Sequence, residues 1–134
     1  MTDFDPQSSA VQAVIESWVA AVGHCDLGGV VAAHSDDVVM FDVPEPQRGV
    51  RGIDAYRSSW PPFFEWIRTG ARFELDELHV EANGDVAFAW ALLRCGTDDD
   101  LAAAPDRRLR LSLGLRRDVA GWRIVHEHHS FAQT

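Results

Sequence analysis

Residues 122–131 read WRIVHEHHSF, and we expect the side chains of this stretch to lie alternately on two faces. Such alternation is typical of a β-strand, because successive side chains of a strand point to opposite faces of its sheet. Residues 73–81, 86–95 and 109–115 have the same period. Turn residues precede two of these strands, at Asn83-Gly84-Asp85 and at Asp118-Val119-Ala120-Gly121. The second half of the chain therefore predicts four strands in antiparallel hairpins, with residues 96–108 as a loose loop.

The first half of the chain has a helical pattern instead. Apolar residues recur at spacings of three and four between Val11 and Val22, which predicts an amphipathic helix from Pro6 to about His24 with Asp5 as its N-cap. Three further elements are expected: a short helix at residues 30–34, a strand at residues 38–43, and a helix from Gly52 that Pro61-Pro62 interrupts.

Helices followed by a run of strands are typical of the α+β class, in which the helices gather on one face of the sheet. A chain of 134 residues can bury an adequate core as one domain, so residues 1–134 are expected to form a single domain. Neither an internal repeat nor a low-complexity segment interrupts this pattern.

Composition excludes several classes of function. The net charge is −9 and all 12 basic residues are arginine, so the surface is expected to repel nucleic acid and anionic lipid. Because lysine is absent, Schiff-base chemistry is excluded. Cys25 and Cys95 lack the spacing of a zinc or disulfide framework and are expected to be core thiols. The N-terminal residues do not resemble a secretory signal, so we expect a soluble, cytoplasmic protein.

The order of these elements, together with several short motifs, resembles the nuclear transport factor 2-like superfamily, in particular its SnoaL-like and ketosteroid-isomerase-like branches. The motifs are Trp18-Val19-Ala20-Ala21, residues 26–32 (DLGGVVA), Asp36-Asp37-Val38, Asp42, residues 52–56 (GIDAY), Ala87-Phe88-Ala89-Trp90 and residues 121–130 (GWRIVHEHHS). The resemblance implies a cone-shaped roll, in which about three N-terminal helices pack on the concave face of a strongly curved, mainly antiparallel sheet. It also implies a pocket for a small apolar or cyclic ligand, no cofactor, and a homodimer through the outer sheet face.

Asp42 falls where ketosteroid isomerases keep their catalytic base. Trp18 and Trp60 fall where those enzymes have tyrosines, and an indole cannot exchange a proton near neutral pH. The family's second aspartate is expected within residues 109–113, which hold no carboxylate. These departures argue against steroid isomerisation.

Alternation on the last strand places Trp122, Ile124, His126, His128 and Ser130 on one face, and His129 on the other. The resemblance makes the first face the concave one. By the same matching, Phe88, Trp90, Leu92 and Arg94 of a neighbouring strand would also face the pocket.

The leading hypothesis is a cofactor-independent acid/base enzyme, such as an isomerase, cyclase, dehydratase or hydrolase, on a cyclic apolar substrate. Asp42 would be the base and His128 the acid or proton shuttle, because an imidazole titrates near neutral pH. His126, Arg94 and Ser130 would position a substrate oxygen, to which the Trp18 indole could also donate. The predicted pocket wall comprises Trp18, Met40, Tyr56, Trp60, Phe63, Phe64, Phe88, Trp90 and Leu92.

Several alternatives remain open at this stage. The histidines could be polar wall residues, Asp42 could form a structural salt bridge with Arg94 or an arginine of residues 48–51, and the aromatic residues could be plain core. Three histidines within residues 126–129 suggest a metal site, but His129 would point away, so no metal is predicted. The alternative function is a non-catalytic ligand-binding or assembly module with the same pocket.

Overall fold

Six strands form one sheet in the order β2-β1-β6-β5-β4-β3 in the computed structural model, which describes residues 5–133. Every pair of neighbouring strands is antiparallel except β1 and β6, which are parallel. The strands are β1 (His34–Phe41), β2 (Val50–Arg51), β3 (Arg72–Asn83), β4 (Val86–Gly96), β5 (Leu109–Asp118) and β6 (Gly121–Ser130).

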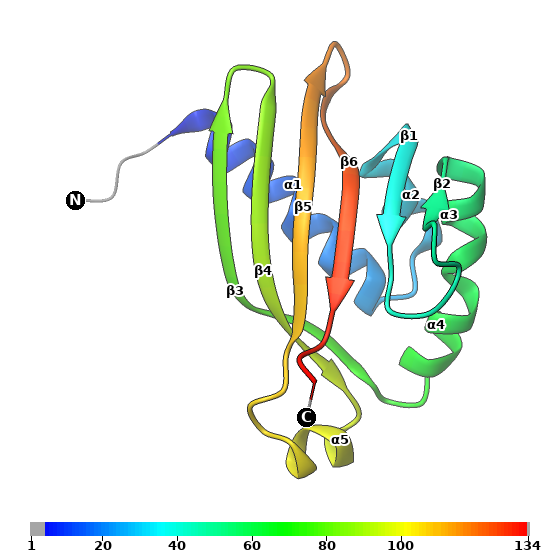
Figure 1. Cartoon of the computed structure of the whole chain (residues 1–134). Coiled ribbons are helices and arrows are strands. Elements are labelled where there is room, and N and C mark those ends of the chain that lie inside the picture. The colour runs from blue at the N-terminus through cyan, green and yellow to red at the C-terminus, as the bar shows by residue number, and fades with distance from the viewer. Residues whose placement is uncertain (1–4, 134) are drawn as a thin grey trace.

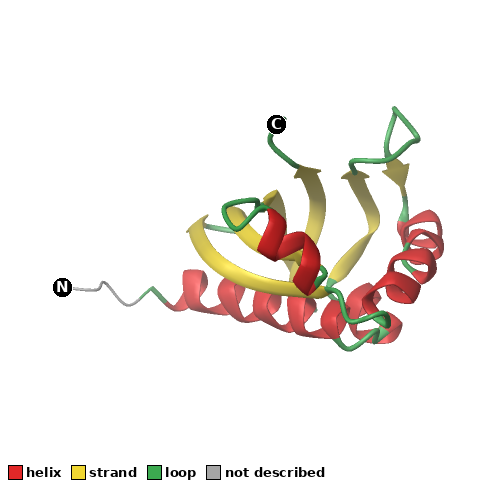
Figure 2. Ribbon diagram, turned by 90° about the horizontal axis from the view of Figure 1, so that it is seen from below, coloured by secondary structure: helices red, strands yellow, loops and turns green. Residues whose placement is uncertain are grey.

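The helices lie on the concave side of this sheet, which curves strongly around them (Figures 1 and 2). They are α1 (Pro6–Gly23), α2 (Leu27–Ala32), α3 (Ile53–Ser59) and α4 (Pro61–Ile67). The predicted N-cap of α1 is confirmed, because the Asp5 carboxylate accepts a hydrogen bond of 3.0 Å from the Gln7 N–H. The α+β class and the curved, mainly antiparallel sheet are therefore confirmed. None of the helices within residues 5–133 is long and apolar enough to cross a membrane.

The structure differs from the sequence-based expectation at three element boundaries. The second helix ends at Ala32 and β1 already begins at His34, where a helix was expected. The helix after Gly52 is two helices, because Pro61 starts α4 directly after α3. Residues 96–108 are not a loose loop throughout, since they contain α5 (Asp98–Ala103), which Thr97 and Asp100 start with a reciprocal capping box.

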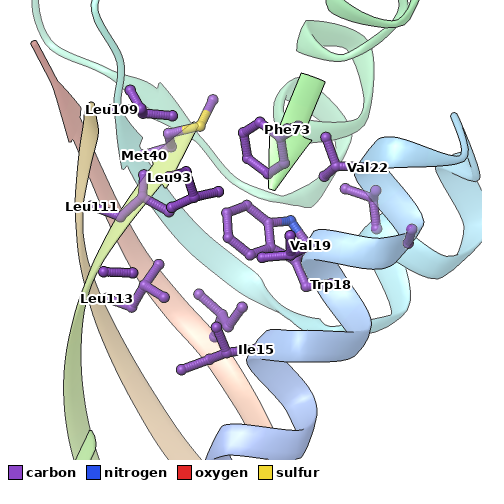
Figure 3. Packing of buried hydrophobic residues seen from close by; sticks show 14 of the residues in the cluster. Ile15, Trp18, Val19, Val22, Met40, Phe73, Leu93, Leu109, Leu111 and Leu113 are labelled. Carbon is purple, nitrogen blue, oxygen red and sulfur yellow. The ribbon is translucent and has the colours of Figure 1, made fainter. Parts of the chain in front are cut away.

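The core lies between α1 and the inner face of the sheet. Figure 3 shows Ile15 and Trp18 of α1 facing Leu111 and Leu113 of β5. Trp18 is fully buried, and its ring meets the Phe73 ring edge to face with the centroids 5.9 Å apart. Burial of the leucines and of the Trp18 ring is the main stabilising contribution here.

The leucines of β5 decide which residues of β4 face inward. Cross-strand partners share a face, and Leu113 pairs with Ala89. Ala89 is therefore buried, whereas Phe88 and Trp90 point outward and are 53% and 41% exposed. The prediction that Phe88, Trp90, Leu92 and Arg94 face the concave side is wrong, because larger side chains do not by themselves define the buried face.

A β-bulge reverses the predicted faces of the last strand. Leu115 pairs with Ile124 but Gly114 pairs with His126, so Val125 is an extra residue on β6. Beyond this bulge the residues opposite the inward leucines are Glu127 and His129, and both are buried. The predicted inward row His126, His128 and Ser130 is on the outer face instead, because one inserted residue moves every following side chain to the other face.

These faces can be tested with two neighbouring residues of β5. Leu113→Ala is expected to lower the free energy of unfolding by about 2 to 5 kcal/mol, because it leaves a cavity in the core. Ser112→Ala, on the exposed face, is expected to change it by no more than about 0.5 kcal/mol. Urea denaturation followed by tryptophan fluorescence measures both values, and equal effects of the two variants would contradict the face assignment.

Candidate functional site

A largely apolar cavity of about 440 Å³ lies between the sheet and α4. Its size is within the range of small-molecule sites. Apart from the indoles of Trp60 and Trp66, four lining residues carry polar or thiol side chains, namely Asp42, Ser59, Cys95 and His129. The remaining lining residues are Met40, Val43, Pro44, Trp60, Pro62, Phe63, Trp66, Phe73, Leu109 and Phe131.

Asp42 and His129 form a pair of titratable groups at this wall. Parallel pairing of β1 with β6 sets Phe41 beside His128, and one residue further on Asp42 meets His129. The Asp42 Oδ1 atom lies 3.5 Å from the Nδ1 atom of His129. The Asp42 side chain is 33% exposed, whereas that of His129 is 6% exposed. An open carboxylate therefore stands next to a fixed, buried imidazole.

A second carboxylate, that of Glu127, holds His129 from behind. Its Oε1 atom accepts a hydrogen bond of 2.8 Å from Nε2 of His129. Its Oε2 atom accepts one of 2.6 Å from the Tyr56 hydroxyl and also contacts Nε2 of His34. Three donors thus surround a carboxylate that is completely buried, as a buried charge requires.

Opposing effects act on the pKa values of this cluster. Burial raises the pKa of Glu127, but the charge of His34 and the hydrogen bonds from His129 and His34 outweigh it and lower the pKa to about 2. Burial lowers the pKa of His129, and the hydrogen bond and charge of Glu127, together with the charge of Asp42, outweigh this effect and raise it. Glu127 is thus a permanent anion at neutral pH, and it favours the protonated form of His129.

Tyr56 and two tryptophans complete the interior side of the cluster. Burial and the charge of Glu127 raise the pKa of Tyr56 well above its ordinary value, so the phenol remains protonated and donates. The indole nitrogens of Trp18 and Trp60 are buried without a hydrogen-bond partner within residues 5–133. Both indoles act against the rise in the Tyr56 pKa.

The Cys95 thiol is an inert part of the cavity wall. Its burial raises its pKa to about 11, so the thiolate is scarce at neutral pH. The expectation of a core thiol holds only in part, because Cys95 is half-buried and lines the cavity. Within residues 5–133, no three His, Cys, Asp or Glu side chains gather in an arrangement that could hold a metal ion.

The structure brings some of the predicted site residues to the cavity and not others. Met40, Asp42, Trp60 and Phe63 line it. Trp18, Tyr56 and Phe64 are buried in the core and are not part of the lining. Phe88, Trp90, Leu92 and Arg94 lie on the other side of the sheet.

The predicted row His126, His128 and Ser130 does not reach the cavity, so it does not fit the roles predicted for it. The Nδ1 atom of His126 lies 2.7 Å from the Val39 carbonyl, in agreement with the alternative of a backbone-bonded wall residue. His128 is exposed, and Ser130 accepts a hydrogen bond of 3.2 Å from Arg110. Asp42 pairs with neither Arg94 nor His128 but with His129, the histidine that simple alternation had excluded from the site.

The sequence-based prediction missed Glu127 and His129, the two residues of β6 that point to the inner side of the sheet. If the strands paired regularly from the Asp118–Gly121 turn, with no bulge, Leu113 would lie opposite His126. The available signal was the strict alternation of Leu109, Leu111, Leu113 and Leu115, which marks the inward face of β5. Val125 itself has no feature of sequence that marks it as the extra residue.

The raised pKa of His129 gives a testable pH dependence of stability. A raised pKa in the folded state contributes stability that is complete below the unfolded pKa of about 6.5 and is lost as the pH rises through the folded value. The wild-type free energy of unfolding is therefore expected to fall as the pH increases above about 6.5, and His129→Gln should remove that slope. Urea titrations between pH 6 and 9 measure it.

His128→Gln is the matched control, because His128 is the neighbouring, exposed histidine of the same strand. This variant is expected to keep the wild-type slope. A slope that survives in His129→Gln would show that another group is responsible.

Comparison with known proteins agrees with this architecture. A crystal structure of an NTF2-like protein of unknown function from Pseudomonas putida is 34% identical, with a TM-score of 0.78 over 92% of this chain and 84% of that chain. An NTF2-like protein with a cystatin-like fold from Novosphingobium aromaticivorans is 18% identical, with a TM-score of 0.77 over 95% and 82%. A ketosteroid isomerase-like protein from Erwinia carotovora atroseptica is 18% identical, with a TM-score of 0.70 over 98% and 100%. The last two show the fold alone.

The search of curated proteins gave no significant match. Among protein families, the model described as a SnoaL-like domain matches residues 11–134, which is nearly the whole chain. The helices on a curved sheet, the cavity between them and this match lead to the same conclusion. The chain belongs to the SnoaL-like domain family, within the NTF2-like superfamily.

Proposed function

We propose that this protein is a cofactor-independent acid/base enzyme that acts on a largely apolar, cyclic small molecule. The observation that carries the proposal is the Asp42–His129 pair, 3.5 Å apart at the wall of a largely apolar cavity. An open carboxylate beside an imidazole of raised pKa supplies a base and an acid within reach of one ligand.

Asp42 is the proposed base. Its carboxylate takes a proton from a carbon next to a ligand carbonyl, the C–H bond breaks, and the electron pair moves into an enolate. His129 donates from Nδ1 to the enolate oxygen, while its Nε2 stays bonded to Glu127. Return of the proton to another carbon completes an isomerisation. In a cyclisation the enolate carbon instead attacks a second carbonyl carbon of the same ligand, the π electrons of that carbonyl move to its oxygen, and this oxygen takes the proton from Asp42.

Glu127, His34 and Tyr56 act through His129 and are positioning residues. Glu127 fixes the orientation of the imidazole and favours its protonated form. His34 and Tyr56 hold the other oxygen of Glu127. Such preorganised charge is most effective where water is excluded, and Trp60, Phe63 and Trp66 give the cavity an apolar wall.

Two substitutions test the reaction on a ligand that co-purifies or emerges from a metabolite screen. Asp42→Asn and His129→Gln are expected to keep ligand affinity within about threefold and to lower the rate of conversion by about 10² or more. Mass spectrometry of the ligand before and after incubation measures conversion, and His128→Gln is the control. A ligand that binds the wild type tightly and is never converted would favour the non-catalytic binding module instead.

We further propose that two copies of the chain pair through the outer face of the sheet. Phe88 and Trp90 of β4 leave large rings exposed on this face, as interfaces commonly do. Glu77 and Glu81 lie outward on β3, and Arg110 and Arg116 lie outward on β5. A two-fold axis along β4 would set the acidic row of one copy over the basic row of the other.

Trp90→Glu is therefore expected to convert a dimer into a monomer, because it places a charge in the centre of the apolar contact. Sedimentation velocity over a range of concentrations measures the mass. Val119→Glu is the control, since Val119 is a fully exposed apolar residue of the β5–β6 turn. A wild-type chain that stays monomeric at all concentrations would contradict the pairing.

A further inference from the structure

An arginine that the acid/base chemistry does not use lies against one of the residues that line the cavity. The guanidinium carbon of Arg107 lies 4.2 Å from the centroid of the Phe131 ring, and Phe131 lines the cavity. The charge of Arg107 also acts to lower the pKa of the Cys95 thiol, against the larger effect of burial. Arg107 thus lies against one lining residue of the cavity, Phe131, and itself lines an adjoining hollow with Leu92, Arg110 and Ala132.

The donors of Arg107 are available to a ligand. Within residues 5–133, Arg107 takes part in no ion pair and its side chain makes no hydrogen bond, although six other arginines pair with carboxylates. A guanidinium stacked on a ring keeps its N–H donors in the plane of the group, where a carboxylate can bind two of them.

The neighbouring residue, Arg108, fixes the backbone that carries Arg107. Its Nη1 atom donates to the carbonyl oxygens of Pro105 and Arg107 at 2.8 and 2.9 Å, and its Nε atom donates to Asp76 at 2.9 Å. The Arg107 N–H in turn donates to Ala104 at 3.1 Å. The backbone of the turn before β5 is therefore held from both sides of Arg107.

The charges of Asp42 and Arg107 would orient a ligand that carries a carboxylate. Asp42 repels a second carboxylate at one part of the wall, while Arg107 attracts one at the Phe131 edge. We propose that Arg107, stacked on Phe131, binds the carboxylate of an amphiphilic ligand whose apolar body fills the cavity. This inference rests on the proposed function and adds a substrate class to it: apolar carboxylic acids, oriented with the reacting carbon toward Asp42 and His129.

Two matched pairs of probes test the proposal, naphthalene-2-acetate with its primary amide and decanoate with decanamide. We expect the wild type to bind each carboxylate about tenfold or more tightly than its amide, because a charge-assisted bidentate contact is lost in the amide. Arg107→Gln should remove this preference and leave amide binding unchanged. Isothermal titration calorimetry at low ionic strength measures the affinities.

Arg117→Gln is the matched control. Arg117 also stacks over an aromatic ring, Trp122 at 5.5 Å, but it lies near the β5–β6 turn, at the far end of the sheet from α5 (Figure 1). This variant is expected to keep the preference of the wild type.

Equal wild-type affinities for acid and amide, a preference that persists in Arg107→Gln, or no binding of any of the four probes would each overturn the carboxylate site. None of these results depends on turnover, so the acid/base proposal would still stand or fall with Asp42→Asn and His129→Gln.

Discussion

The carboxylate of Glu127 is the group around which the interior of this protein is organised. A completely buried anion would be strongly destabilising alone, and it is accommodated because His34, Tyr56 and His129 all direct donors at it. Those donors come from β1, α3 and β6, so the cluster links the parallel strand pair to the helix beside it. Truncation of any one donor would leave an uncompensated charge in a dry environment, which ties the geometry of the site to the stability of the fold.

The same anion determines what His129 can do. With Nε2 engaged by Glu127, only Nδ1 faces Asp42 and the cavity. Glu127 also raises the pKa of the imidazole and so favours the protonated form, which donates from both ring nitrogens. The wall therefore separates two roles: a buried carboxylate that orients and an open carboxylate that can exchange protons with a ligand.

How much of the fold and of the candidate site could be predicted depends on the kind of pattern in the sequence. Period-two segments and the helical stripe of α1 marked the strands and the first helix, because these patterns follow directly from backbone geometry. Asp42 was recognisable from its resemblance to a known catalytic position, and it lies at the cavity. Its partner was not, since a one-residue bulge at Val125 leaves no mark in the sequence and exchanges His128 for His129. The positions of Phe88 and Trp90 were also predicted wrongly. Large aromatic side chains suggest burial, but the buried leucines of β5 pair with the alanines of β4 and so leave Phe88 and Trp90 on the outer face.

By itself, the sequence determined the α+β class, the order of helices before strands, and the presence of a carboxylate and histidines near the ends of two strands. These depend on local periodicity and on turn chemistry, which act within a few residues. Only the tertiary structure decided which histidine joins the site, which rings are exposed, and that Arg107 lies against Phe131, a lining residue of the cavity. Those outcomes depend on strand register, on the bulge, and on contacts between segments far apart in the chain, where a shift of one residue reverses every side chain beyond it.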